Sequence, residues 1–312
     1  MTTPNVSRRR ALQVSAAVPI VLGAGDALAA KPALKLDLAV PRDLMFAYLK
    51  LRASTVTQDV YYWFTGTLDL AAPGQAIKPI VKVETLILRR TEKLEDYKYH
   101  VTDWEASFYR DLETNQIIVG EIKNPITNRM VQPIHYREGP VKFLFTENEP
   151  RLVGIRDILP NTGKPFNYPY KKLGDDFWMT KDSYINSPHW LKKDEWPLEA
   201  SGERLTVQTS STLKGKWSDI INPAIAAAPT DFSYAATSDW LPWMLMGQAP
   251  GYVLWHSAGK KLMDLNEAPA DTVEAVRRIH PIWFNRPEPW PAFTNQYFQY
   301  KEQRKPAAPS QN

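Results

Sequence analysis

The amino-acid sequence predicts a mainly β protein whose antiparallel strands form a meander, closed into a barrel or a strongly curled sheet. The chain of 312 residues contains 26 prolines, which divide it into short elements. Its 11 tryptophans supply large aromatic surfaces for burial. Segments rich in β-branched and aromatic residues alternate with turn-forming residues, as in antiparallel sheets. Short N-terminal and C-terminal helices and long covering loops complete the predicted fold.

One helix and three strands are predicted in the first part of this fold. Residues 42–53 carry apolar side chains at helical spacing, which favours a short helix. Residues 59–70 are aromatic and β-branched, and the Ala-Pro-Gly sequence that follows favours a turn. Residues 80–90 and 97–110 are two longer predicted strands. In the second of them, side chains alternate between two faces of the sheet.

The next segment predicts the meander most clearly. Turn-forming residues at 111–116 and 124–128 separate three apolar stretches. We therefore expect consecutive antiparallel strands, with a further strand after them, at residues 97–110, 117–123, 130–136 and 141–146. Meanders of this kind commonly curl around a ligand-sized interior.

The second half of the chain is less regular. Residues 160–197 are rich in Pro, Asn, Tyr and Trp, which indicates long loops packed over the sheet. Residues 203–213 alternate cleanly and predict a strand, and residues 268–279 predict a helix. Without a linker or internal repeat, we expect one domain at residues 30–303 and a disordered tail at 304–312.

The first 29 residues have the pattern of a twin-arginine signal peptide. Arg8 and Arg9 precede a short apolar stretch at residues 11–22, and the small-x-small pattern of a cleavage site ends at Ala29. The apolar stretch is too short for a stable membrane span. We expect export through the twin-arginine translocase to the periplasm or the exterior; the alternative is a basic amphipathic helix that stays attached. A chain without cysteine can fold before export without needing disulfides.

Charge and motifs exclude several functions. The formal charge of +4 falls when the arginine-rich signal is removed, and a nearly neutral chain gives no basis for nucleic-acid binding. The five histidines do not have the spacing of a zinc site, and no dinucleotide or phosphate-binding glycine motif occurs. We expect neither a metal nor a cofactor.

Several ordered motifs resemble the DUF1838 family, a family of unknown function. The chain is similar to it in Tyr109-Arg110-Asp111-Leu112-Glu113-Thr114-Asn115, in Asn124-Pro125-Ile126-Thr127-Asn128, in residues 131–135 and in Ser238-Asp239-Trp240-Leu241-Pro242-Trp243-Met244. Asn115 and Asn128 replace glycines of the family pattern, and asparagine tolerates the left-handed backbone that such turns need. The resemblance implies a shared fold and pocket but no chemistry.

Three residues near the predicted meander are candidates for catalysis. His135 is the candidate proton carrier, because an imidazole titrates near neutral pH. Arg110 would stabilise a developing anion, and Asp111 would orient one of the other two. The alternatives are a hydrogen-bonded structural His135, a cross-strand ion pair of Arg110, and a turn capped by Asp111. For catalysis, Arg110 and His135 must line one enclosed cavity together with a tryptophan.

A further set of residues are candidates for ligand binding. Tyrosine and histidine side chains can donate hydrogen bonds into a pocket, and tryptophans can line an apolar cavity. The alternative for each is core packing or, for Asn124, a turn. The candidates are Tyr62, Trp63, His100, Trp104, Asn124, Trp240 and Trp243.

These predictions define three candidate functions. The first is an exported protein that binds a hydrophobic or aromatic small molecule in its barrel, as a cofactor-independent lyase, isomerase or hydrolase. The second is a non-catalytic periplasmic carrier. The third is a structural protein of the cell envelope. A closed cavity with hydrogen-bonded ionisable groups favours the enzyme, whereas a purely aromatic cavity favours the carrier.

Overall fold

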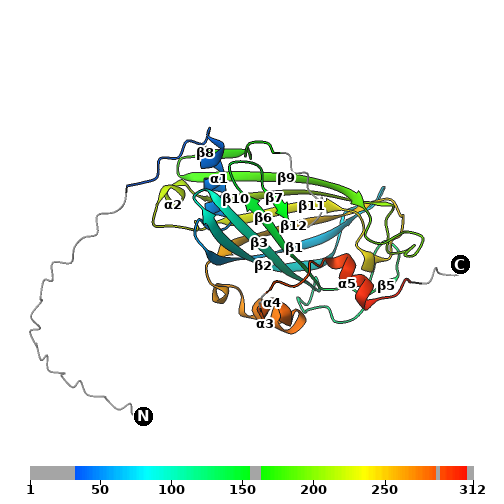
Figure 1. Ribbon diagram of the computed structural model, residues 1–312. Coiled ribbons are helices and arrows are strands. Elements are labelled where there is room, and N and C mark those ends of the chain that lie inside the picture. The colour runs from blue at the N-terminus through cyan, green and yellow to red at the C-terminus, as the bar shows by residue number, and fades with distance from the viewer. Residues whose placement is uncertain (1–31, 155–162, 286–288, 308–312) are drawn as a thin grey trace, which may run out of the picture. The chain divides into compact units, whose positions relative to one another are not determined.

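Ten antiparallel strands form one curled sheet in the computed structural model, which describes residues 32–154, 163–285 and 289–307 (Figure 1). Their order is β7-β6-β3-β2-β1-β12-β11-β10-β9-β8. The strands are β1 (Gln58–Ala71), β2 (Lys78–Glu95), β3 (Lys98–Arg110), β6 (Tyr136–Phe145), β7 (Arg151–Val153), β8 (Tyr170–Leu173), β9 (Asp176–Pro188), β10 (Arg204–Lys216), β11 (Asp231–Ser238) and β12 (Tyr252–Leu262). The predicted curled antiparallel sheet is confirmed.

The curl produces a half-barrel whose two edges are joined by loop segments. Backbone hydrogen bonds join Glu149 to Lys164 and Phe166 to Glu147, next to the edge strands β7 and β8. In the centre of the sheet, β1 and β12 approach so closely that a Cβ on Gly259 would lie 2.0 Å from the carbonyl oxygen of Trp63. Glycine permits this close approach of two backbones.

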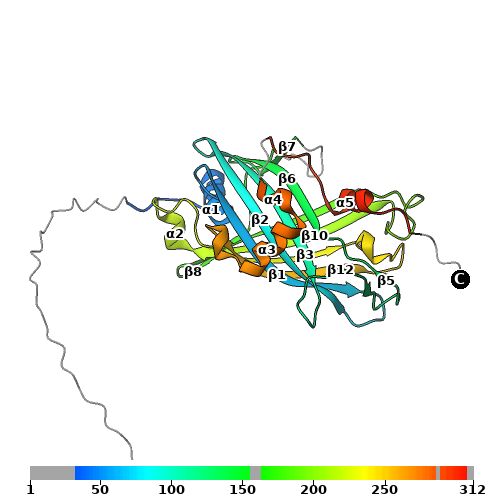
Figure 2. The same cartoon turned by 90° about the horizontal axis from the view of Figure 1, so that it is seen from below.

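The two faces of the sheet differ in what covers them. On the outer face, Trp104 and Phe108 of β3 pack with Leu86 of β2 against two helices, α3 (Ala270–Ile279) and α4 (Pro281–Asn285). Figure 2 shows these helices across the outer side of the first strands. The inner face encloses the interior of the half-barrel, and its side chains decide what the interior can bind.

Each end of the interior is filled by an apolar cluster. Helix α1 (Pro41–Arg52) fills one end, where Tyr48 packs with residues of β1 and β6. The 3-10 helix η1 (Pro242–Met244) and helix α5 (Gln296–Gln303) fill the other. Figure 1 shows α1 and α5 at opposite ends of the sheet. The remaining short elements are α2 (Trp217–Ile221), η2 (Leu265–Glu267), and a separate pair of two-residue strands, β4 (Ile122–Lys123) and β5 (Met130–Val131).

The predicted order of strands after β3 is wrong. Residues 117–123 and 130–135 do not continue the main sheet. Apart from one bridge between Ile117 and Arg110, the described strands there are β4 and β5, which pair with each other. The strand beside β3 is β6, which starts at Tyr136. Residues 117–135 therefore form an excursion, in which the side chains of Asn124 and His135 accept hydrogen bonds from backbone N–H groups.

The predicted long loops at residues 160–197 are also wrong in their central part, which forms the hairpin of β8 and β9. The segment from residue 289 onward contributes to the core, because Tyr297 and Tyr300 of α5 are buried there. The predicted signal peptide at residues 1–29 lies outside the described residues, as do residues 308–312. The proposed division of the chain into signal, domain and tail therefore remains a prediction.

Candidate functional site

The interior of the half-barrel contains a cavity of about 390 Å³. Ligand pockets commonly have volumes of about 300–1,000 Å³. Inward-facing side chains from β1, β2, β3, β6 and β9 to β12 line it, and the N-terminal part of α5 contributes Tyr297. The lining is mixed, since charged groups occur beside nine aromatic rings: Phe64, Tyr136, Phe143, Trp190, Phe232, Tyr234, Trp255, Phe293 and Tyr297.

Two carboxyl groups face each other on the cavity wall. Glu105 of β3 and Glu138 of β6 are partners in the antiparallel register, and both line the cavity. Directly opposed like charges destabilise a sheet. We call Glu105 and Glu138 the carboxyl pair. Because this arrangement costs stability, it indicates a functional site.

Hydrogen bonds fix one member of the carboxyl pair and leave the other open to the cavity. Glu105 Oε1 accepts from Ser107 Oγ at 2.7 Å and from Tyr136 Oη at 3.1 Å. Glu138 lines the cavity, where its side chain is enclosed by protein but remains accessible to water. The carboxyl pair is therefore an anchored group beside a group that a ligand can reach.

Both members of the carboxyl pair have raised pKa values. Burial raises the pKa of Glu105, although the hydrogen bonds from Ser107 and Tyr136 oppose this effect. Burial, with a contribution from the charge of Glu105, raises the pKa of Glu138 to about 8. Two close carboxyls with raised pKa values hold a proton more readily at neutral pH than isolated ones, as in acid–base sites.

Three cations line the same cavity next to Asp103. Arg52 pairs with Asp103 through Nη2, and Arg89 Nε lies 3.2 Å from Asp103 Oδ1. The third cation is Lys181 of β9, whose Nζ lies 5.8 Å from the centre of the Phe143 ring. Burial lowers the pKa of Lys181 to about 8, and the charge of Arg52 adds to the decrease. Arg52, Arg89 and Lys181 are called the cationic group below.

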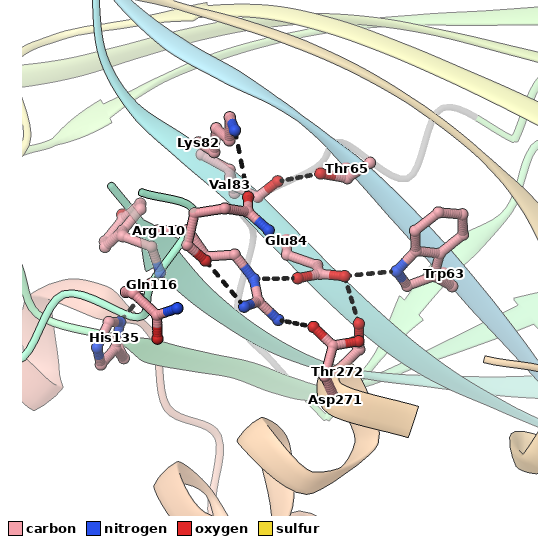
Figure 3. Close-up of polar contacts among 12 residues, drawn as sticks. Trp63, Thr65, Lys82, Val83, Glu84, Arg110, Gln116, His135, Asp271 and Thr272 are labelled. Carbon is pink, nitrogen blue, oxygen red and sulfur yellow. Dashed lines mark hydrogen bonds and ion pairs between the residues drawn. The ribbon is translucent and has the colours of Figure 1, made fainter. Parts of the chain in front are cut away.

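The predicted catalytic residues do not line this cavity. Arg110 points to the outer face, where its Nε donates to Glu84 Oε2 at 2.6 Å and its Nη2 donates to Asp271 at 2.9 Å (Figure 3). Asp111 accepts from the backbone N–H groups of Glu113 and Thr114, as a turn cap does. These contacts match the alternative roles considered for the two residues, which are a cross-strand ion pair for Arg110 and a capped turn for Asp111.

His135 is held by the backbone through both ring nitrogens. Its Nδ1 accepts from the Tyr109 N–H at 3.1 Å, so Nε2 donates to the carbonyl oxygen of Ile118 at 2.9 Å. Burial lowers the pKa of His135, which keeps the ring neutral. It lines a separate hollow of about 510 Å³, and Arg110 lines another of about 310 Å³. The expectation that Arg110 and His135 share one cavity is wrong.

We expect that His135→Ala destabilises the protein by about 1–3 kcal/mol, because the replacement leaves a backbone donor and acceptor unpaired. The folded protein favours the neutral ring, so this stabilisation is present above the unfolded pKa of about 6.5 and is lost as the pH falls. Urea unfolding at several pH values should therefore show a difference that shrinks below about pH 6.5. The exposed His256→Ala is the control; an equal effect of both variants would contradict the structural role.

The predicted ligand-binding residues also lie outside the cavity lining. Tyr62 is buried and donates to the carbonyl oxygen of Leu51 at 2.7 Å. Trp63 and Trp104 belong to the outer-face cluster, and His100 lies near Glu92. Three more residues have structural contacts: Asn124 caps its turn and bonds Met244, and Trp240 and Trp243 pack in the cluster at the α5 end.

The turns of the predicted motif do form as expected. Asn115 and Asn128 both have φ of 59°, in the left-handed region that asparagine tolerates. The polar residues Asp111 and Asn124 of these turns accept hydrogen bonds from the backbone of the excursion between β3 and β6. These polar side chains therefore stabilise the local structure of the turns.

Neither a metal site nor a membrane span emerges from the described residues. Within residues 32–154, 163–285 and 289–307, no group of three or more His, Asp or Glu side chains is arranged to hold a metal ion. In the same part of the chain, no helix has the length and apolar character needed to cross a bilayer.

Fold and cavity together define an antiparallel β half-barrel with a polar and aromatic interior of ligand size. The family model of the protein of unknown function DUF1838 matches residues 57–302, which cover the whole sheet. The chain belongs to this DUF1838 family. Comparison with curated proteins finds no significant match.

Proposed function

We propose that the interior cavity binds a small molecule and that the carboxyl pair transfers a proton to or from it. The proposal makes the protein a cofactor-independent enzyme of the lyase, isomerase or hydrolase type. The observation that carries it is the direct cross-strand opposition of Glu105 and Glu138 on the cavity wall. A sheet with only a structural task gains nothing from two facing carboxyls.

The hydrogen bonds around the pair support a division of roles. Tyr136 and Ser107 donate to Glu105, which favours the ionised form of that group. Glu138 has no such donor among the described residues and lies beside the cavity, so it is the better proton donor. After donation, the proton returns from the ligand or from solvent, and the pair again holds one proton.

The cavity lining also refines the expected ligand. Nine aromatic side chains support binding of an apolar or aromatic body, as the sequence predicts. The charged residues require polar groups on the ligand as well. The twin-arginine pattern of residues 1–29 supports a periplasmic or extracellular site, and cytoplasmic retention of an Arg8→Lys, Arg9→Lys precursor would test it.

A cavity-filling variant tests ligand binding. Thr209 of β10 lines the cavity, whereas its neighbour Ser210 is exposed on the other face. We expect native mass spectrometry of the wild-type protein from its own cells to show a co-purifying small molecule. Thr209→Trp should lose that molecule, and Ser210→Trp should retain it. Ser211→Leu fills the cavity less and serves if Thr209→Trp does not fold.

Two results separate the candidate functions. Equal retention of the molecule by the Thr209 and Ser210 variants would place binding outside the cavity and contradict the proposal. Retention of the molecule without any turnover, in the wild type and in carboxyl-pair variants alike, would favour the carrier.

A further inference from the structure

The cationic group contains more positive charge than the protein itself neutralises. Asp103 is the shared carboxylate of Arg52 and Arg89. Within the described residues the ammonium group of Lys181 makes no hydrogen bond or ion pair, and it lies over the Phe143 ring. Three cations thus face one carboxylate at this end of the cavity.

The carboxyl pair does not cancel this excess. Glu105 lies two residues from Asp103 on the same face of β3, so the two side chains are separated by about 7 Å along the strand. If the pair holds one proton, it contributes a single negative charge. The cavity then keeps a net positive charge, and a buried charge without a partner is costly. An anion bound at Lys181 would neutralise the remaining positive charge.

We propose that the ligand of the cavity is a small carboxylate with an apolar or aromatic body, and that Lys181 binds its carboxylate group. This inference rests on the proposed function of the cavity. The carboxylate lies at the cationic group, and the body extends toward Trp190, Trp255 and Tyr297. The ligand's carboxylate then lies near Asp103, and proton transfer takes place near Glu105, two residues further along β3. The reacting carbon is therefore a few bonds from the carboxylate.

Lys181 is the residue to test because the two arginines already have a partner. Lys181→Met removes the charge and keeps most of the side-chain length. Replacing a buried charge with an apolar group seldom unfolds a protein. Lys181→Arg keeps the charge. Lys171→Met, on the exposed strand β8, is the control outside the cavity.

The experiment compares 1-naphthoate with its neutral isostere 1-naphthamide by isothermal titration calorimetry on the purified protein. We expect the wild type to bind the naphthoate about 10-fold to 100-fold more tightly than the amide, as one charged hydrogen bond in a cavity supplies. Lys181→Met should remove this preference and leave amide binding within about 2-fold. Lys181→Arg and Lys171→Met should keep the preference.

The binding data distinguish failure of the anion site from failure of the cavity as a binding site. Equal binding of both probes by the wild type, or an unchanged preference in Lys181→Met, would overturn the anion site while leaving the cavity as a binding site. Absence of binding of both probes, or binding that Thr209→Trp does not reduce, would overturn the proposed function itself.

Discussion

Replacing Glu84 with alanine is expected to destabilise the fold by about 3–5 kcal/mol, because it leaves the buried guanidinium of Arg110 with too few partners. Glu84 is 7% exposed and accepts hydrogen bonds from three elements. Its Oε1 accepts from Trp63 Nε1 at 2.8 Å and also from Thr272 of α3, and Oε2 accepts from Arg110. Asp271, the other acidic partner of Arg110, has a side chain that is 67% exposed and compensates little.

Two further variants separate the charge of Glu84 from its hydrogen bonds. Glu84→Gln keeps an acceptor for Trp63 and Thr272 but loses the charge opposite Arg110, so an intermediate loss is expected. Glu274→Ala removes the exposed ion pair with Arg277 on the same helix and should change stability by less than about 0.5 kcal/mol. Urea unfolding measures all three. A loss for Glu84→Ala no larger than for Glu274→Ala would contradict the structural role given to Arg110.

Replacing Glu138 with glutamine is expected to reduce turnover of the ligand about 10²-fold to 10⁴-fold, the usual contribution of a positioned proton donor. The amide keeps the shape of the side chain and cannot donate a proton from oxygen. Glu113→Gln, in an exposed turn outside the cavity, is the control. Turnover by Glu138→Gln within a few-fold of the wild type would remove Glu138 from the mechanism.

The same variant is expected to be more stable than the wild type at alkaline pH. The pKa of Glu138 is raised from 4.5 to about 8 in the fold, so its contribution to stability is present below about pH 4.5 and is lost as the pH rises through about 8. Glutamine avoids this loss. Because Glu138 is exposed to the cavity, solvent screens the effect, and we expect a gain of about 1 kcal/mol at pH 8 and none near pH 4. A gain that does not depend on pH would contradict the raised pKa.

The regular part of the fold follows from the sequence because its strands border an apolar core. In β3, the alternation that predicts two faces places Trp104 and Phe108 under α3 and α4, as found. The helix predicted at residues 42–53 corresponds to α1, and the strand predicted at 203–213 corresponds to β10. Where one face meets apolar partners, the hydrophobic period identifies the element.

The site could not be predicted in the same way, because the cavity lining mixes charged, polar and aromatic side chains. Strand β9 has Lys181, Ile185 and Ser187 on its inner face, so it lacks the apolar alternation of a strand and its sequence favours a loop. The available signal for the carboxyl pair is the occurrence of Asp103 and Glu105 on the same face of β3 as Val101 and Tyr109. Charges within an otherwise apolar face indicate either an ion pair or a polar cavity.

The error at His135 shows how sensitive a site prediction is to strand boundaries. A strand at residues 130–136 would direct His135 and Tyr136 to opposite faces of the sheet. In the structure β6 begins at Tyr136, which lines the cavity, and His135 lies just before the strand. His135, the predicted proton carrier, is thus the immediate neighbour of Tyr136, which donates a hydrogen bond to Glu105 of the carboxyl pair. Sequence alone does not show that β6, and not residues 130–136, pairs with β3.

Infrared spectroscopy with carbon-13 labelled glutamate carboxyls tests the shared proton of Glu105 and Glu138 directly. At pH 7 we expect the wild type to show the absorption of a protonated glutamate carboxyl, which titrates away as the pH rises through about 8. Glu138→Gln should lose this absorption, because the hydrogen bonds from Ser107 and Tyr136 favour the ionised form of Glu105. Full ionisation of every glutamate in the wild type at pH 6 would contradict the carboxyl pair and, with it, the proposed proton transfer.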